Sequence, residues 1–117
     1  MAVSPSYRAY VLEQLQVIGN VTAKAMFGGV GLYSQSRFFG LIADDTLYLK
    51  VDDGNRGDYE RVGAGPFRPY GDESYSMHYY ELPAEVLEDR SELRVWAEKA
   101  VAAARRKSAG RRKRPRG

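Results

Sequence analysis

The chain has 117 residues, of which 44% are hydrophobic and none is cysteine. This length suits one domain with a modest core, and the apolar content is that of a globular protein. The lack of cysteine excludes disulfides, thiolate nucleophiles and Cys-ligated metals, and it agrees with a reducing compartment. No apolar run is long enough to cross a bilayer and the first residues lack a signal-peptide core, so we expect a cytoplasmic protein without membrane contact.

Charge is distributed unevenly along the chain. The net charge is +3, but 8 of the 18 basic residues lie beyond Ala104 and none of the 15 acidic residues lies beyond Glu98. With 10 basic and 15 acidic residues, residues 1–104 carry a net −5, and residues 105–117 carry +8. We therefore expect an acidic folded domain over residues 1–104 and a basic disordered tail over residues 105–117, where Gly, Ser and Pro interrupt any helical pattern.

The first third of the chain predicts a helix followed by antiparallel strands. Ser4 and Pro5 have the composition of a helix start, and apolar residues recur at helical spacing as far as Ile18, before Gly19-Asn20 ends the helix. Extended segments follow, with turns between them. These segments are residues 21–27, 28–33, 37–43 and 46–51.

Three glycines interrupt the second of these segments. Gly28, Gly29 and Gly31 lie among apolar and aromatic residues, where glycine weakens a strand unless the backbone bends or another chain segment approaches closely. We interpret them as a bulge, a sharp bend or a close backbone approach. The alternative is a loop that offers N–H groups to an anion or a partner, although no helix start and no P-loop Lys-Ser/Thr follows.

The remainder predicts a short helix, two strands and a longer helix. Residues 52–55 indicate a turn in which Asn55 or Asp53 caps a helix that ends near Val62. Prolines confine residues 66–70 to an edge or a loop, and residues 74–82 form the last strand. After a helical turn over residues 83–89, Ser91 caps a helix with an apolar stripe that ends at Ala104, and Trp96 anchors this helix on the sheet.

These elements predict an α+β fold. Its antiparallel sheet has an N-terminal helix, a short middle helix and a C-terminal helix. The order is helix, three or four strands, helix, two strands, helix.

No pattern of residues indicates catalysis. His78 is the only histidine, so a His-based catalytic or metal site would depend on one imidazole. Asp52, Asp53 and Asp58 lack the spacing and the distal Glu of a calcium loop. Nucleophile-elbow, Walker and dinucleotide motifs are missing from the sequence. We therefore expect a protein that is not an enzyme and has no catalytic residue, cofactor or metal.

Tyrosines on the predicted strands are the main candidates for recognition. An aromatic sheet face can stack unpaired bases or contact a protein. A nucleic-acid face also needs interleaved cations, and the sheet offers only four in an acidic body, so we favour protein contact or core packing. The tyrosines are Tyr33, Tyr48, Tyr75, Tyr79 and Tyr80, and the cations are Lys24, Arg37, Lys50 and Arg68.

The basic tail is the best candidate for contact with DNA. Its cations could neutralise several phosphates without reading sequence, which gives weak and salt-dependent binding. The alternative is an unstructured, solubilising terminus. The tail residues are Arg105, Arg106, Lys107, Arg111, Arg112, Lys113, Arg114 and Arg116.

Three segments resemble the N-terminal domain of the TfoX/Sxy family. They are residues 25–33, 39–51 and 77–83, which contain Met-Phe-Gly-Gly, Leu-Tyr-Leu-Lys and Tyr-Tyr-Glu-Leu-Pro. The resemblance covers about residues 5–104 and implies the same α+β fold. It also implies membership of a family named for regulators of natural competence, which act with a cyclic-AMP receptor protein at promoters. Full-length regulators of that family carry a second, helical domain where this chain has its basic tail.

We therefore expect a non-enzymatic, transcription-associated interaction module that contacts a protein partner such as the transcription machinery. Nonspecific DNA contact through the tail and homodimerisation remain open. The expected partner-binding residues are Phe27, Gly28, Gly29, Tyr33, Tyr48, Lys50, Tyr79 and Tyr80. The alternative is a small-ligand or nucleotide-binding module that uses the Gly28–Gly31 bend, with Lys50 or Arg37 near an anion.

Overall fold

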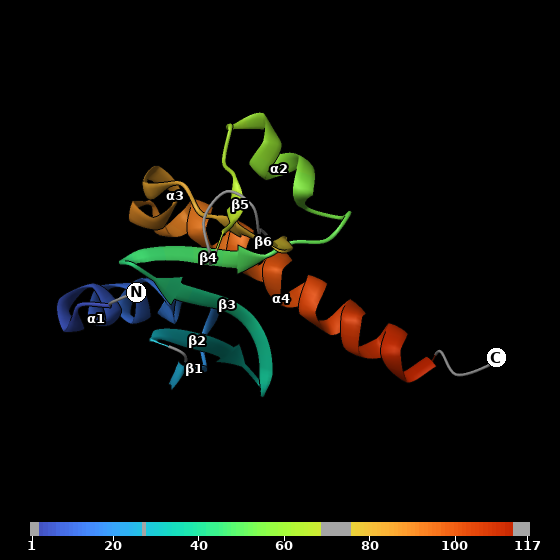
Figure 1. Ribbon diagram of the computed structural model, residues 1–117, viewed down its shortest axis with the longest axis horizontal. Helices are drawn as coiled ribbons and strands as arrows, with labels where there is room; N and C mark the ends of the chain where they lie inside the picture. The colour runs from blue at the N-terminus through green and yellow to red at the C-terminus, as the bar shows by residue number, and fades with distance from the viewer. Residues whose placement is uncertain (1–2, 27, 69–75, 114–117) are drawn as a thin grey trace.

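A six-stranded antiparallel sheet forms the centre of the fold (Figure 1). The structure, a computed structural model, describes residues 3–26, 28–68 and 76–113. The strands follow the order β1-β2-β3-β4-β6-β5, which places the proline-flanked strand at an edge, as predicted. They are β1 (Val21–Met26), β2 (Gly29–Ser34), β3 (Arg37–Ala43), β4 (Thr46–Lys50), β5 (Pro66–Phe67) and β6 (Ser76–Glu81).

Tight turns connect the first four strands. Gln35 and Ser36 have φ of 52° and 69°, and Asp44 and Asp45 have φ of 51° and 50°. Two successive residues with positive φ are typical of the turns that match the twist of antiparallel hairpins. Gly28, with φ of 81°, lies between β1 and β2, so the glycine-rich bend begins as a hairpin turn.

The helices are α1 (Pro5–Gln14), the 3-10 helix η1 (Leu15–Ile18), α2 (Arg56–Arg61), α3 (Ala84–Glu88) and α4 (Arg90–Lys113). The Tyr7 N–H donates to Ser4 Oγ at 3.2 Å, which confirms the predicted cap of α1. The prediction for α4 is wrong: the Asp89 carboxylate accepts from the N–H groups of Ser91 and Glu92 at 3.1 and 3.3 Å. Asp89 therefore supplies the acceptor one residue before the helix begins.

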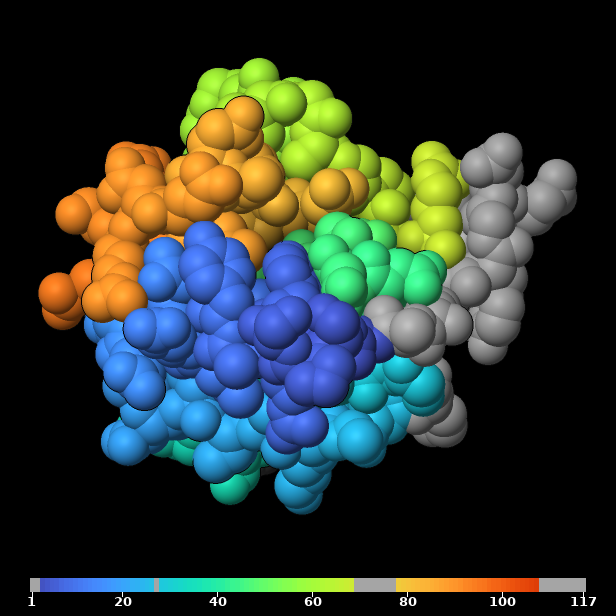
Figure 2. All heavy atoms as spheres, turned by 90° about the vertical axis from the view of Figure 1, so that its left-hand side faces the viewer, coloured from blue at the N-terminus to red at the C-terminus, as the bar shows by residue number. Residues whose placement is uncertain are grey.

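The described helices pack on one face of the sheet, and the expected α+β fold is confirmed. Alternate strand residues join residues of α1, η1 and α4 in one buried cluster, which includes Leu32, Ile42, Leu47, Leu49, Val11, Leu15, Leu93 and Ala97. Figure 2 shows α1 (blue) lying between the N-terminal hairpin and the orange α3 region. Gln14 joins these elements, because its Nε2 donates to the Leu87 carbonyl at 2.9 Å and its Oε1 accepts from Arg90 Nε at 3.0 Å.

Helix α4 continues past Ala104, where we expected it to end, and runs to Lys113. Residues 105–113 are thus helical instead of disordered, and residues 114–117 lie outside the described part of the chain. Lys, Arg and Ala are strong helix formers, and Arg106 is tied to Asp52 by two hydrogen bonds of 2.7 and 2.8 Å. No helix within the described ranges has both the length and the apolar character needed to span a membrane.

Trp96 packs differently from our expectation. Its ring meets Tyr59 of α2 edge-on, at a centroid distance of 4.8 Å and an interplanar angle of 82°. Tyr59 in turn lies 5.7 Å from the ring of Tyr80 in β6. The aromatic contact of Trp96 is therefore with α2, and the buried Tyr59 lies between Trp96 and Tyr80.

Candidate functional site

A row of aromatic rings crosses the face of the sheet opposite the helices. The rings belong to Tyr33 of β2, Phe38 of β3 and Tyr79 of β6, with centroids 5.3 Å and 5.6 Å apart along the row. All three side chains are partly buried. Lys24 Nζ lies 5.5 Å from the centroid of Tyr33 and Lys50 Nζ lies 4.8 Å from that of Tyr79. A cation therefore lies at each end of this aromatic row.

A β-bulge and a glycine make the row possible. Pairing between β2 and β3 shifts so that Tyr33 lies opposite Phe38, while Phe39 is fully buried in the core. The extra residue turns Phe38 to the face that Tyr33 occupies. A Cβ at Gly31 would lie 2.7 Å from Met26 Sδ and 3.0 Å from Phe38 Cε1, so a larger residue would require the Met26 side chain to move and would crowd the Phe38 ring.

A second aromatic pair on this face lies in acidic surroundings. The rings of Tyr48 in β4 and Phe67 in β5 are 4.7 Å apart. Burial raises the pKa of Tyr48, and the charges of Glu81 and Asp44 raise it further. The open face is thus divided into a cationic part around the aromatic row and an acidic part around Tyr48.

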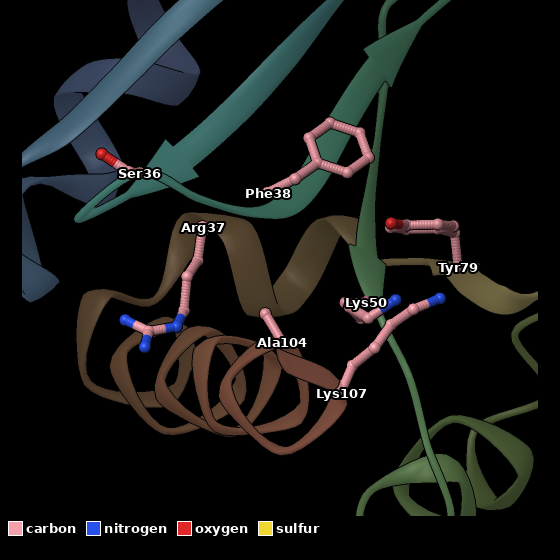
Figure 3. A pocket seen from close by; sticks show the side chains of 7 residues that line it. All are labelled: Ser36, Arg37, Phe38, Lys50, Tyr79, Ala104 and Lys107. Atoms are coloured by element: carbon pink, nitrogen blue, oxygen red, sulfur yellow. The ribbon is translucent and has the colours of Figure 1, made fainter. Parts of the chain in front are cut away.

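A cavity of about 330 Å³ lies where the aromatic row approaches α4 (Figure 3). Figure 3 shows Lys50 and Lys107 extending toward the space beneath the Tyr79 ring, whereas the guanidinium of Arg37 turns away along α4. Among the described residues, three cations and no acid line this space, which we call the cationic cavity. Its lining residues are Ser36, Arg37, Phe38, Lys50, Tyr79, Ala104 and Lys107.

Backbone pairing and a buried amide fix the position of Lys50. Lys50 lies opposite Tyr79 in the register between β4 and β6. The buried Asn55 donates from Nδ2 to the Lys50 carbonyl at 3.1 Å and accepts from the Asp52 N–H at 2.8 Å. Lys50 itself is only 5% exposed, which is unusual for a lysine. The backbone of Lys50 is therefore fixed at the end of β4, and its side chain is buried there.

The surroundings of the cavity are electropositive. Burial lowers the pKa of His78, and the charges of Lys50, Lys107 and Arg56 lower it further. Burial also raises the pKa of Tyr79 to about 12, which keeps its phenol neutral. The nearby carboxylate of Asp52 is bound by Arg106, whose hydrogen bonds hold the pKa of Asp52 below its ordinary value.

Comparison with protein families identifies a family for this chain. The family model of the TfoX N-terminal domain matches residues 13–104. The chain belongs to the TfoX N-terminal domain family. This family is linked in general to the regulation of competence and DNA uptake. A comparison with curated proteins found no match.

Within this TfoX N-terminal domain, the structure divides the expected partner-binding residues between the two faces of the sheet. Tyr33, Tyr48, Lys50 and Tyr79 lie on the face opposite the helices. Tyr80 is 4% exposed and belongs to the core, because it pairs with the core residue Leu49 in the sheet. It is therefore not available to a partner.

The glycine bend does not meet the cations that we expected near it. Gly28 and Gly29 line a separate cavity of about 510 Å³ between α1 and the first hairpin, and Arg8 is its only cationic lining residue among those described. Arg37 and Lys50 meet at the other end of β2, in the cationic cavity. The alternative placed Lys50 or Arg37 near an anion at the Gly28–Gly31 bend, whereas the structure places both residues at a different cavity from Gly28 and Gly29. Phe27 and Tyr75 lie outside the described residues.

The expected tail residues have different surroundings. Arg106 is paired with Asp52, and Lys107 lines the cationic cavity. Arg105 is exposed, and Arg111, Arg112 and Lys113 lie in the last turns of α4. Arg114 and Arg116 lie outside the described residues.

Sequence reasoning did not predict that Phe38 faces the cationic cavity, or that Lys107 of α4 lies beside the sheet residues there. Phe38 and Phe39 are chemically equivalent neighbours, so the sequence holds no signal for which of them faces the core. Lys107 follows an apolar stripe at helical spacing that continues through Val101 and Ala104. Because this stripe packs on the sheet, its continuation was the available signal that the first cations after Ala104 lie close to the domain.

Proposed function

We propose that the chain is a non-enzymatic, transcription-associated interaction module that contacts DNA through the C-terminal end of α4. The observation that carries this proposal is the continuity of α4 from Arg90 to Lys113. From Arg105 to Lys113 the helix contains six cations and no acid. Figure 1 shows this end of α4 projecting beyond the sheet.

The base of this projecting segment is anchored on the domain. Arg106 binds Asp52 in the β4–α2 turn, and Ala103 and Ala104 are buried. Nine helical residues at 1.5 Å per residue span about 14 Å. Cations held on such a segment lose less conformational freedom on meeting phosphates than cations on a disordered chain, which supports a DNA-contacting role.

The net negative charge of residues 1–104 limits the expected DNA contact to the C-terminal end of α4. Residues 1–104 carry more acidic than basic residues, so they repel the DNA backbone, whereas residues 105–113 attract it. Binding should be independent of sequence and strongly dependent on salt. Removing one cation that meets a phosphate should reduce the slope of log K against log salt by about 0.9.

Neutralising the last cations of α4 tests this proposal. We expect the triple variant Arg111→Gln, Arg112→Gln and Lys113→Gln to bind duplex DNA at least about 10-fold more weakly, with a smaller salt slope, in fluorescence anisotropy titrations. A matched control removes three cations from residues 1–104: Arg8→Gln, Arg61→Gln and Arg94→Gln. Equal affinities of the two triple variants would contradict DNA contact through α4.

A protein partner is a second candidate, favoured by the acidic part of the open face. Tyr48 and Phe67 form a partly buried aromatic pair beside Glu81, and no described helix covers them. Interfaces are rich in such aromatic anchors. A photoreactive amino acid at position 48 should crosslink one partner in cells, while the same group at the exposed Val62 should not. Identical crosslinks from both positions would contradict this candidate.

A further inference from the structure

The cationic cavity combines features that a phosphorylated ligand requires. Lys50 comes from β4, Lys107 from α4 and Arg37 from β3, and no described acidic residue lines the space. An anion that enters the cavity can make direct ionic contacts with these cations, and hydrogen bonds between charged groups are stronger than neutral ones. Inside a partly buried site such contacts are stronger than on an open surface.

Arg37 lines the cavity, and although its guanidinium turns along α4 (Figure 3), the residue carries an unpaired donor. Its Nε is buried and has no hydrogen-bond partner among the described residues. Buried donors are nearly always paired, so an orphaned one indicates a missing acceptor. Ser36, which also lines the cavity, supplies a hydroxyl that can donate to an anion. The Ser36 hydroxyl therefore adds a neutral donor to the cations that line the cavity.

The aromatic side of the cavity points to a planar group on the same ligand. Phe38 and Tyr79 lie 5.6 Å apart with an interplanar angle of 58°, so their rings form two walls of the cavity. Bases stack on such rings regardless of sequence. The volume of about 330 Å³ lies at the lower end of the range of small-ligand pockets, which suits one nucleotide better than a long strand.

We propose that the cationic cavity binds a nucleoside monophosphate, either as a free nucleotide or as the 5′ end of a nucleic-acid strand. Lys50 and Lys107 contact the phosphate, and the rings of Phe38 and Tyr79 contact the base. This site is separate from the last turns of α4, so it does not depend on the proposed DNA contact.

Titration of the full chain with three probes tests this site. We expect adenosine 5′-monophosphate to bind at least 10-fold more tightly than adenosine or inorganic phosphate in calorimetry. The backbone amide NMR signals of Phe38, Lys50 and Tyr79 should shift. Equal affinity for adenosine would overturn the phosphate contact, and unchanged signals at these three residues would overturn the location.

Matched lysine variants on one helix test the assigned residues. Lys107→Met should weaken binding of adenosine 5′-monophosphate by about 10-fold, whereas Lys99→Met, which removes a partly exposed lysine paired with Asp58, should not. Lys50→Met should have the larger effect, and Lys107→Met keeps the test valid if the buried substitution unfolds the domain. Equal binding by Lys107→Met and Lys99→Met would overturn the proposal.

Two further experiments distinguish a free nucleotide from a strand end, and the cavity proposal from the DNA-contact proposal. A hexadeoxyadenylate with a 5′ phosphate that binds more tightly than the free nucleotide would identify a strand end, and equal or weaker binding would identify the free nucleotide. The triple variant at residues 111–113 should keep its nucleotide affinity, while Lys50→Met should keep its affinity for duplex DNA. Each proposal can therefore fail while the other holds.

Discussion

Arg106 and Asp52 join the C-terminal part of α4 to the turn after β4. Arg106 Nε and Nη2 donate to the two carboxylate oxygens of Asp52 at 2.7 and 2.8 Å, across 54 residues of sequence. Paired hydrogen bonds of this kind fix orientation as well as distance. This contact lies next to Lys107, so it positions one side of the cationic cavity as well as the base of the projecting helix.

Removing this contact should loosen the end of α4. We expect Arg106→Gln to lower the free energy of unfolding by about 0.5–1 kcal/mol, because the pair is partly solvent-exposed. Amides of residues 106–113 should exchange faster with deuterium. Arg105→Gln, a substitution of the exposed neighbour, is the matched control, and equal exchange in both variants would show that Arg106 does not anchor the helix.

The stability of the domain should fall in acid through two aspartates. Hydrogen bonds from Arg106 lower the pKa of Asp52, and those from Lys99 lower the pKa of Asp58. The folded carboxyls bind protons more weakly than the unfolded ones, so their stabilisation is complete above about pH 4 and is lost as pH falls through the lower folded values. In urea unfolding between pH 2 and 6, the free energy of unfolding of the double variant Asp52→Asn, Asp58→Asn should fall less steeply with decreasing pH than that of the unsubstituted protein. An equally steep decrease in both proteins would show that other groups cause the loss of stability in acid.

Gly29 should be required by the packing of the first hairpin. A Cβ at this position would lie 2.6 Å from the carbonyl oxygen of Ile42, and backbone atoms cannot yield as a flexible side chain can. We expect Gly29→Ala to destabilise the fold by about 1–3 kcal/mol in urea unfolding. Gly65→Ala, where a Cβ meets no atom within 4 Å, should change stability little. Equal effects would contradict the steric argument.

Asp89 should matter more than Ser91 for the start of α4. Its carboxylate accepts two N–H groups of the first turn, whereas Ser91 already lies inside the helix. Asp89→Ala should cost about 1 kcal/mol of unfolding free energy, and Ser91→Ala less than about 0.5 kcal/mol. Thermal unfolding of both variants measures the difference. A larger loss in Ser91→Ala would restore the cap that the sequence suggested.

Local spacing was enough to predict the elements and one face of the sheet. Leu47 and Leu49 alternate with Tyr48 and Lys50, and the structure places the leucines in the core and the other two on the opposite face. Helical spacing likewise predicted the buried stripe of α4 from Leu93 to Ala104. These patterns are readable because hydrogen bonding within a strand or a helix repeats over a few residues.

Local spacing could not predict which of two similar adjacent residues faces the core. Tyr79 and Tyr80 are identical neighbours, and only pairing with Lys50 and Leu49 places the first on the open face and the second in the core. The β-bulge decides between Phe38 and Phe39 in the same way. A shift of one residue in register exchanges the two faces of a strand, and long-range packing sets that register.

The sequence by itself determined the order of helices and strands, the core stripe, the hairpin turns and the imbalance of charge between the domain and its last residues. Only the tertiary structure brought Arg37, Lys50, Tyr79 and Lys107 around one cavity. Their meeting depends on a bulge, on strand register and on the docking of α4 through Arg106. These features arise from contacts between residues far apart in the chain, which no local pattern encodes.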